Sequence, residues 1–204
     1  MTDNTKHSAH DVGSETEQLI EQIVHHTALP HTRLSLLFDK IVKTCGEVAS
    51  WVWVILIAVI VLNVTMRYAF GEGRIEFEEL QWHLYAIGFL IGLSYCVYND
   101  SHIRIDILHE QFSPRMRAWV EFFGILILLI PYIAVILVYA PPFIEYSFAT
   151  GEVSDAPGGL PYRWAIKSFM LIGYILLLIA AVSRLSRASS LLFGFPKAVD
   201  RPKG

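Results

Sequence analysis

Four long apolar stretches constrain this chain more than any other feature of its sequence. Residues 48–66, 80–99 and 122–144 contain no Asp, Glu, Lys or Arg, and residues 164–183 contain only Lys167. A helix that crosses a bilayer needs about 20 mostly apolar residues, and each stretch meets that length. Because lipid offers the backbone no hydrogen-bond partner, such stretches must fold as helices. The sequence therefore predicts an all-α integral membrane protein with four transmembrane helices.

The expected spans lie at about residues 46–67, 79–98, 117–140 and 164–185, inside a membrane domain over about residues 31–193. The composition agrees, since 54% of the residues are hydrophobic and only 17% are charged. A membrane β-barrel would instead show alternating apolar and polar residues. The net charge is −3, and no basic patch is interleaved with aromatic residues, so nucleic acid is not an expected partner.

The segments outside the membrane domain are polar. Residues 1–30 form an N-terminal tail without the apolar core of a secretory signal peptide, and residues 194–204 form a C-terminal tail. In the first tail, Ser14 with a glutamate three residues later is typical of a capping box, which predicts a short amphipathic helix over residues 14–28. The connector at residues 99–115 also mixes apolar and charged residues, which is typical either of a solvated connector with a few apolar residues in the headgroups or of a short interfacial segment. We therefore expect short amphipathic interfacial helices beside the four spans.

Basic residues near the span ends gather on one side of the membrane. That side would hold Arg33, Lys40, Lys43, Arg104, Arg115, Arg117, Arg184, Arg187, Lys197, Arg201 and Lys203. The other side would hold Arg67, Arg74, Arg163 and Lys167. Because the side richer in Lys and Arg is normally cytoplasmic, both termini are expected in the cytoplasm. The outer loops would then be about residues 67–78 and 145–163.

Proline, glycine and serine mark where we expect helices to begin, bend and end. Ser113 followed by Pro114 is typical of a helix start, with the serine as cap. Pro131 lies inside the third span and predicts a kink, and the Pro141-Pro142 pair predicts the end of its helix. The glycines and prolines of residues 151–161 predict a non-helical outer loop.

Asn63 and Arg67 lie near the end of the first span and share one helix face, because they are four residues apart. The simplest interpretation of Arg67 is an anchor whose charged end reaches the outer headgroups. Alternatively, both side chains bond to a partner helix or to lipid phosphates. Asn63 needs a hydrogen-bond partner if it is buried, and its own helix, another span or a second subunit would supply it.

Glu78 and Glu79 open the second span, where the helix dipole favours acidic residues. Capping of the helix start is the first interpretation. A salt bridge to Arg67 or Arg74, which would close the outer ends of the first two spans, is the second. The third is that these acids help to dock a protein on the outer surface.

No catalytic, cofactor or metal site is expected. His83 is the one histidine well inside a span, and the other spans supply no facing histidine for haem. Zinc would need a cluster of ligands, which the sequence lacks. His102 and Asp106 are four residues apart and would share a helix face, where they could pair and tie the connector to the span ends.

Several short motifs occur in an order that resembles a known family. They are Asn63-Val64-Thr65-Met66-Arg67, Glu78-Glu79-Leu80, His102-Ile103-Arg104-Ile105-Asp106, Ser113-Pro114-Arg115, and Gly158-Gly159-Leu160-Pro161 followed by Lys167. They fit, in turn, an N-x-x-x-R element, acids at the start of span two, an H-[IV]-x-[IV]-D signature, and the entries to spans three and four. Over about residues 34–190 the chain resembles the DctQ-like small membrane subunit of tripartite ATP-independent periplasmic (TRAP) transporters.

The resemblance implies a transporter in three parts, in which this chain is a scaffold without a substrate site or cofactor. A large permease subunit would carry an organic acid with sodium, and a periplasmic substrate-binding protein would dock on the outer face. The chain would span the bacterial inner membrane and contact its lipids. The residues implied as subunit or lipid contacts are Asn63, Arg67, Glu78, Glu79, His102, Asp106, Gly158, Gly159, Pro161 and Lys167.

Two other functions remain open at this stage. The first is a small four-helix redox protein that binds haem or quinone, which would need paired histidines or cysteines near the membrane. The second is a structural membrane protein with an unrelated partner. A carrier acting alone would normally show polar or broken helices near mid-membrane, whereas these span centres are rich in Ile, Leu, Val and Ala.

Overall fold

The computed structural model describes residues 29–99 and 112–199, and it is built from helices in these ranges. They are α2 (Arg33–Phe70), α3 (Ile75–Tyr98), α5 (Pro114–Phe123), the π-helical η1 (Gly124–Leu129), α6 (Ile130–Ala149) and α7 (Arg163–Phe193). α5, η1 and α6 follow one another directly. Four helical segments are therefore long and apolar enough to cross a membrane, which confirms the predicted fold class. The predicted helix over residues 14–28 and most of the connector lie outside the described residues.

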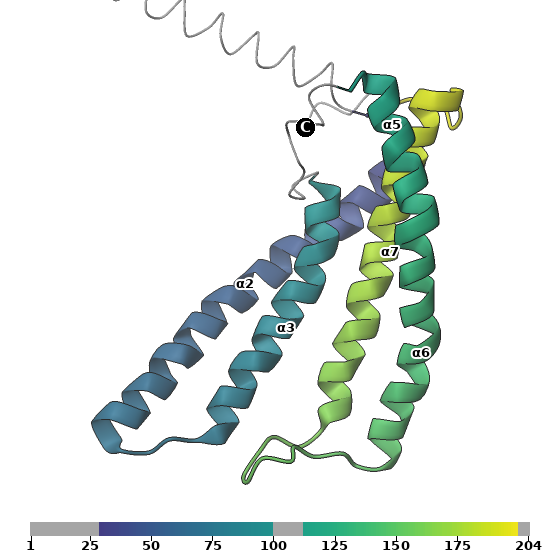
Figure 1. Cartoon of the computed structure of the whole chain (residues 1–204). Coiled ribbons are helices and arrows are strands. Elements are labelled where there is room, and N and C mark those ends of the chain that lie inside the picture. The colour runs from purple at the N-terminus through teal and green to yellow at the C-terminus, as the bar shows by residue number, and fades with distance from the viewer. Residues whose placement is uncertain (1–28, 100–111, 200–204) are drawn as a thin grey trace, which may run out of the picture.

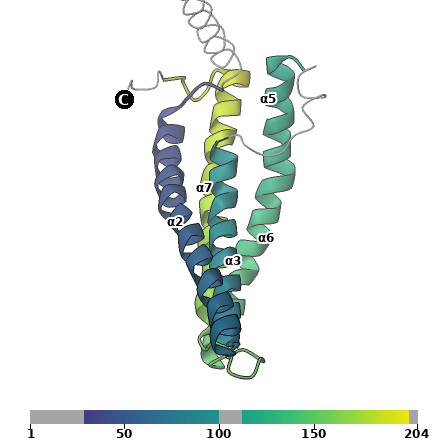
Figure 2. The same ribbon diagram turned by 90° about the vertical axis from the view of Figure 1, so that its left-hand side faces the viewer.

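The four spans form two antiparallel pairs (Figure 1). α2 and α3 make one pair, α6 and α7 make the other, and the α2–α3 pair is tilted relative to the α6–α7 pair. We call the end with the connections at 71–74 and 150–162 the loop end, and the opposite end, where α2 begins and α7 ends, the tail end. α7 packs against α2, α3, α5 and α6, so it is the central helix of the described part (Figures 1 and 2).

One stripe of α2 carries its contact face. Val42, Ala49, Leu56 and Asn63 are buried and recur at every seventh residue, which keeps them on one side of the helix. Ala49 packs with Ile91 of α3 and Leu176 of α7. The remaining faces of α2 carry many exposed apolar side chains. Such a surface suits a helix that faces lipid or a membrane partner.

A second apolar cluster joins α7 to the third span. Ile125 of η1 and Ile133 of α6 pack against Leu177 and Ala181 of α7. Ile133 and Ala181 are fully buried. This cluster fixes the α6–α7 pair along the middle of the spans.

Buried polar contacts join α2 to α7 at the tail end. Ser183 of α7 donates a hydrogen bond to the carboxylate of Asp39, and the hydroxyls of Thr32 and Ser186 lie 2.8 Å apart. Thr32 also caps α2 by accepting a bond from the backbone N–H of Ser35. In lipid, such interhelical bonds add to van der Waals packing as a cause of helix association. These residues were not predicted from the sequence as helix contacts.

The predicted end of the third span's helix at Pro141-Pro142 is wrong. α6 continues through both prolines to Ala149. Proline removes a helical hydrogen bond, but membrane helices tolerate it where neighbouring groups hold the chain. Here the next turns pack on α7, since the Lys167 ammonium lies 3.9 Å from the centre of the Phe143 ring and Phe148 packs edge-on against Trp164. These contacts hold the helix together beyond the prolines.

Of the other two signals of the third span, the helix start at Ser113-Pro114 is confirmed, and the kink at Pro131 stays a prediction. Ser113 caps α5, since its hydroxyl accepts a bond from the backbone N–H of Met116 at 3.3 Å. The π-helical stretch η1 ends at Leu129, two residues before Pro131. Proline lacks the N–H that would close the helical hydrogen bond at its position. The wider π turn beside it accommodates this missing bond, and the N–H of Ile130 binds the carbonyl of Ile125.

We expect Gly173→Leu to destabilise the protein. A Cβ at Gly173 would lie 2.9 Å from the Cβ of Leu90 and 3.2 Å from its carbonyl oxygen, so glycine lets α3 and α7 approach closely. Overpacking of this kind costs about 1–3 kcal/mol of unfolding free energy. Thermal unfolding in detergent measures it. The control is Gly92→Leu, because a Cβ there meets nothing within 4 Å. Equal melting temperatures for the two variants would contradict this account of the α3–α7 contact.

Candidate functional site at the loop end

Most of the candidate residues that the structure describes meet at the loop end. Arg67 is at the end of α2, Glu78 and Glu79 are in the first turns of α3, and Lys167 is in the second turn of α7. The loop at residues 150–162 runs between α6 and α7 and reaches the start of α3 (Figure 1). The name loop-end network is used for the side chains of Arg67, Glu78, Glu79, Glu152, Ser154, Arg163 and Lys167.

Glu78 binds Arg67 rather than the start of its own helix. The Arg67 guanidinium donates a hydrogen bond to a carboxylate oxygen of Glu78, and both side chains are about half exposed. The N-terminus of α3 has no side-chain cap, although Glu76 and Glu78 lie in its first turn near the positive end of the helix dipole. The salt bridge considered as the second interpretation of Glu78 is thus present, and it closes the loop ends of α2 and α3.

Glu79 binds the loop that precedes α7. One carboxylate oxygen accepts a hydrogen bond from the Ser154 hydroxyl, and the other accepts one from the backbone N–H of Leu160 at 2.6 Å. These bonds join residues 75 and 81 positions apart in the chain. Because both carboxylate oxygens bind the loop, the loop is held close to α3 and in one orientation. Glu79 therefore ties the α2–α3 pair to the loop between α6 and α7.

Glu152 ties the same loop to α7. Its carboxylate accepts a hydrogen bond from Lys167 and lies 3.7 Å from the Nε of Arg163, while its carbonyl accepts a bond from the Arg163 backbone N–H at 3.3 Å. The hydrogen bond from Lys167 holds the pKa of Glu152 below its ordinary value of 4.5. Glu152 is thus ionised at neutral pH and gives Lys167, which is mostly buried, a negative partner.

Two glycines let the loop turn between these anchors. Gly158 has φ of 78°, a left-handed conformation that favours glycine. A Cβ at Gly159 would lie 2.4 Å from the Cβ of Ser154, which real atoms do not tolerate, so a side chain there would displace the serine that binds Glu79. Pro161 is exposed at the end of the loop, and Tyr162, with φ of 63°, precedes the first residue of α7.

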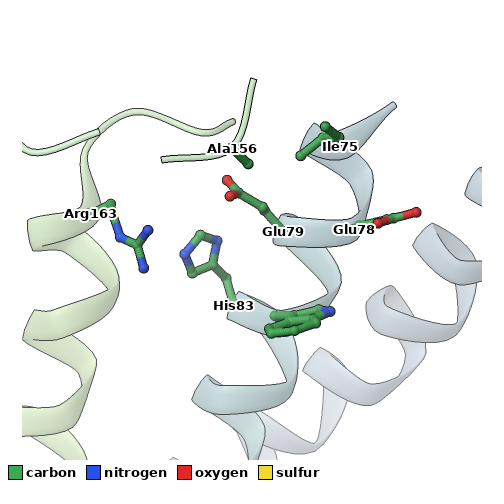
Figure 3. Close-up of a pocket in the computed structure, with 7 residues that line it drawn as sticks. Ile75, Glu78, Glu79, His83, Ala156 and Arg163 are labelled. Atoms are coloured by element: carbon green, nitrogen blue, oxygen red, sulfur yellow. The ribbon is translucent and has the colours of Figure 1, made fainter. Parts of the chain in front are cut away.

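A pocket of about 340 Å³ lies beneath the loop. It is lined by Ile75, Glu78, Glu79, Trp82, His83, Ala156 and Arg163. Figure 3 shows His83 of α3 and Arg163 of α7 pointing toward each other across it, with Glu79 above them. The pocket therefore offers both donor and acceptor groups where α3, the loop and α7 meet, and it could receive a polar side chain of a partner.

Asn63 is separated from these contacts although it lies one turn before Arg67. It is 8% exposed, and its side-chain carbonyl oxygen has no hydrogen-bond partner among the described residues. His102 and Asp106 lie outside the described residues, so their expected pairing stays a prediction. Within residues 29–99 and 112–199, no three His, Cys, Asp or Glu side chains gather as metal ligands would.

The Arg67–Glu78 pair was among the alternatives predicted from the sequence, but the partners of Glu79 and Lys167 were not. Arg163 was recognised only as a charge on the loop side, and neither Glu152 nor Ser154 was identified as a partner. Their pairing depends on the path of the loop at residues 150–162, which no helical or strand period encodes. The sequence offered one signal for this pairing. The loop before the fourth span contains acids and bases, and the start of the second span carries acids that need partners.

One known protein family is similar to this chain over most of its described residues. The model of one family, described as "Tripartite ATP-independent periplasmic transporters, DctQ component", matches residues 56–190. That range begins in the middle of α2, ends near the end of α7, and includes the whole loop-end network. In a comparison with curated proteins, none matched the chain.

We expect Glu79→Ala to free the loop from α3. Both hydrogen bonds to the loop would be lost, so the Leu160 amide should exchange with solvent about tenfold faster, as expected for loss of a bond to a charged acceptor. Hydrogen exchange with mass spectrometry measures it. The control is Glu72→Ala, since Glu72 pairs only with Arg74 on the surface. Unchanged exchange at Leu160 in the Glu79 variant would rule out this tie.

We also expect the loop to loosen in acid. Because the pKa of Glu152 is lower in the folded protein than its ordinary 4.5, its stabilisation is present above pH 4.5 and is lost as pH falls through the folded value. Exchange of the loop amides, corrected for its intrinsic pH dependence, should therefore rise as the pH falls below 4.5 and through the lower pKa of folded Glu152. In Glu152→Gln this rise should be smaller. An equal rise in both proteins would show that another group is responsible.

Proposed function

The chain belongs to the DctQ family, the small membrane component of tripartite ATP-independent periplasmic transporters, and on this premise we propose that it acts as a fixed scaffold for a large permease subunit. The large subunit would carry an organic acid together with sodium. The present chain would hold it in the bacterial inner membrane without binding substrate. The family membership rests on a match to about two thirds of the chain, which includes α3, the third span, nearly all of α7 and the loop-end part of α2.

The observation that carries the scaffold role is the double tie of the loop at residues 150–162. Glu79 binds it to α3 and Glu152 binds it to α7. The two helix pairs are thereby coupled at the loop end, while Asp39 and Ser183 couple α2 to α7 at the tail end. A chain fixed at both ends is suited to stay in place while a partner moves against it.

The surfaces for partners follow from the same arrangement. The spans expose many large apolar side chains, which would face the large permease subunit and membrane lipids. We place the loop end on the periplasmic side and both termini in the cytoplasm, as the distribution of Lys and Arg predicts. The exposed loop residues, Val153 and Tyr162 among them, would then face a docking substrate-binding protein.

The alternative function, a redox protein that binds haem or quinone, is not supported by the positions of the described histidines. Among the described residues, His31 lies at the tail end just before α2, and His83 lies near the loop end of α3. Two histidines at opposite ends of the spans are not placed to ligate one haem. We therefore propose no enzymatic activity for this chain.

Purification from native membranes in a mild detergent tests the proposal. We expect the tagged chain to bring with it a larger permease with many spans, in near-equal amount by mass spectrometry. Vesicles that contain only this chain should show no sodium-driven uptake of organic acids, and vesicles that contain both subunits with the binding protein should show it. Recovery of the chain alone, or uptake by the chain alone, would refute the scaffold role.

A further inference from the structure

A groove of about 500 Å³ lies between α3 and the third span, at the tail-end half of the protein. α7 forms its floor with Tyr174, Leu177 and Arg184, and Leu93 and Val97 of α3 form one wall. The other wall comes from the third span and consists of Glu121, Gly124, Ile125, Leu129 and Tyr132. The groove exists because the third span packs on α7 rather than closing against α3.

The polar groups of this groove stand at its two ends and bind each other. At one end the hydroxyls of Tyr132 and Tyr174 lie 2.8 Å apart. At the other end the Arg184 guanidinium donates a hydrogen bond to Glu121, and both side chains are largely buried. Between the two ends the lining is aliphatic apart from Gly124. An occupant therefore needs an apolar body and no polar group inside the groove.

The length of the groove matches one leaflet of a bilayer. Tyr174 and Arg184 are ten residues apart on α7, which corresponds to about 15 Å at the helical rise of 1.5 Å per residue. Half of a hydrocarbon core is also about 15 Å thick. Tyr174 lies near the middle of α7 and Arg184 lies toward its tail end, so the groove runs from mid-membrane to one surface.

The wall of the third span leaves open space on the side of the groove. η1 widens the helix where it borders the groove, and π-helical stretches in longer helices are frequent at functional sites. Gly124 begins this stretch, and a Cβ built on it meets nothing within 4 Å. The space in front of Gly124 is therefore open, although the neighbouring Ile125 is buried in the apolar cluster.

We propose that this groove binds one acyl chain of a phospholipid from the leaflet at the tail end. An acyl chain is apolar along its length and carries no polar group, as this lining requires. The phosphodiester would lie beyond the Glu121–Arg184 pair, near the first turn of α5. That turn carries Arg115 and Arg117, and Arg117 shares a face with Glu121 four residues later. The proposal does not depend on the transport function.

Two glycine variants test it in membranes that contain the full chain. The probe is phosphatidylglycerol with a photoactivatable diazirine in the middle of one acyl chain, and peptide mass spectrometry locates the labelled residues. In the wild type we expect label on the groove residues Leu93, Leu129 and Leu177. Gly124→Leu should reduce this label by about tenfold, because its side chain occupies the space of several methylenes. Gly92→Leu, which adds the same side chain at an open position that is not part of the groove lining, should leave it unchanged.

The outcomes separate the proposal from its alternatives. Label spread evenly over all lipid-facing residues, or equal label in the two variants, would show bulk lipid and overturn it. A second probe replaces Gly124 with a photo-crosslinking phenylalanine analogue in native membranes. A crosslink to phospholipid supports the proposal, and a crosslink to a protein partner overturns it. Loss of the large subunit from detergent extracts bears only on the proposed scaffold function, since the lipid label is measured on this chain alone.

Discussion

The close packing of α7 is the constraint on which the rest of the structure depends. Lipid tails are as apolar as the side chains of the spans, so helices in a membrane associate through fitted surfaces and polar contacts rather than through the hydrophobic effect. α7 meets this need with small buried residues, Gly173, Ala180, Ala181 and Ala188. They let α7 pack against every other described helix. The positions of α3 and of the third span, and with them the loop end and the groove, follow from this one helix.

The two ends of the bundle are held by different physical means. At the tail end, Asp39, Ser183 and Arg184 make buried contacts, where water competes little and each bond is strong. At the loop end, Glu79 and Glu152 make contacts that are partly exposed, and their strength comes from bonds to several partners at once. The loop end is therefore the part of the protein that pH and surface partners can alter.

The fold class and the number of spans could be predicted from the sequence because lipid leaves an apolar stretch of 20 residues one solution. The start of α5 could also be predicted, because a serine cap followed by proline is a local signal for a helix start. The end of α6 could not, because Phe143 and Phe148 pack on α7 and this contact overrides the two prolines. For the candidate site, the Arg67–Glu78 pair was one of the predicted alternatives, but the partners of Glu79 and Lys167 were not predicted. The bond from Leu160 to Glu79 depends on a loop path that only tertiary contacts determine.

The groove shows how an open bundle and a scaffold role fit together. A closed four-helix bundle would bury the inner faces of α3 and α6 against each other, whereas here both faces border a groove over α7. An acyl chain in that groove would supply the contacts that a closing helix would otherwise make, since dispersion depends on the presence of neighbouring atoms and not on their covalent origin. The internal pairing of Tyr132 with Tyr174 and of Glu121 with Arg184 is what makes this possible. If either pair were broken, a polar group would face the acyl chain without a partner and would cost free energy.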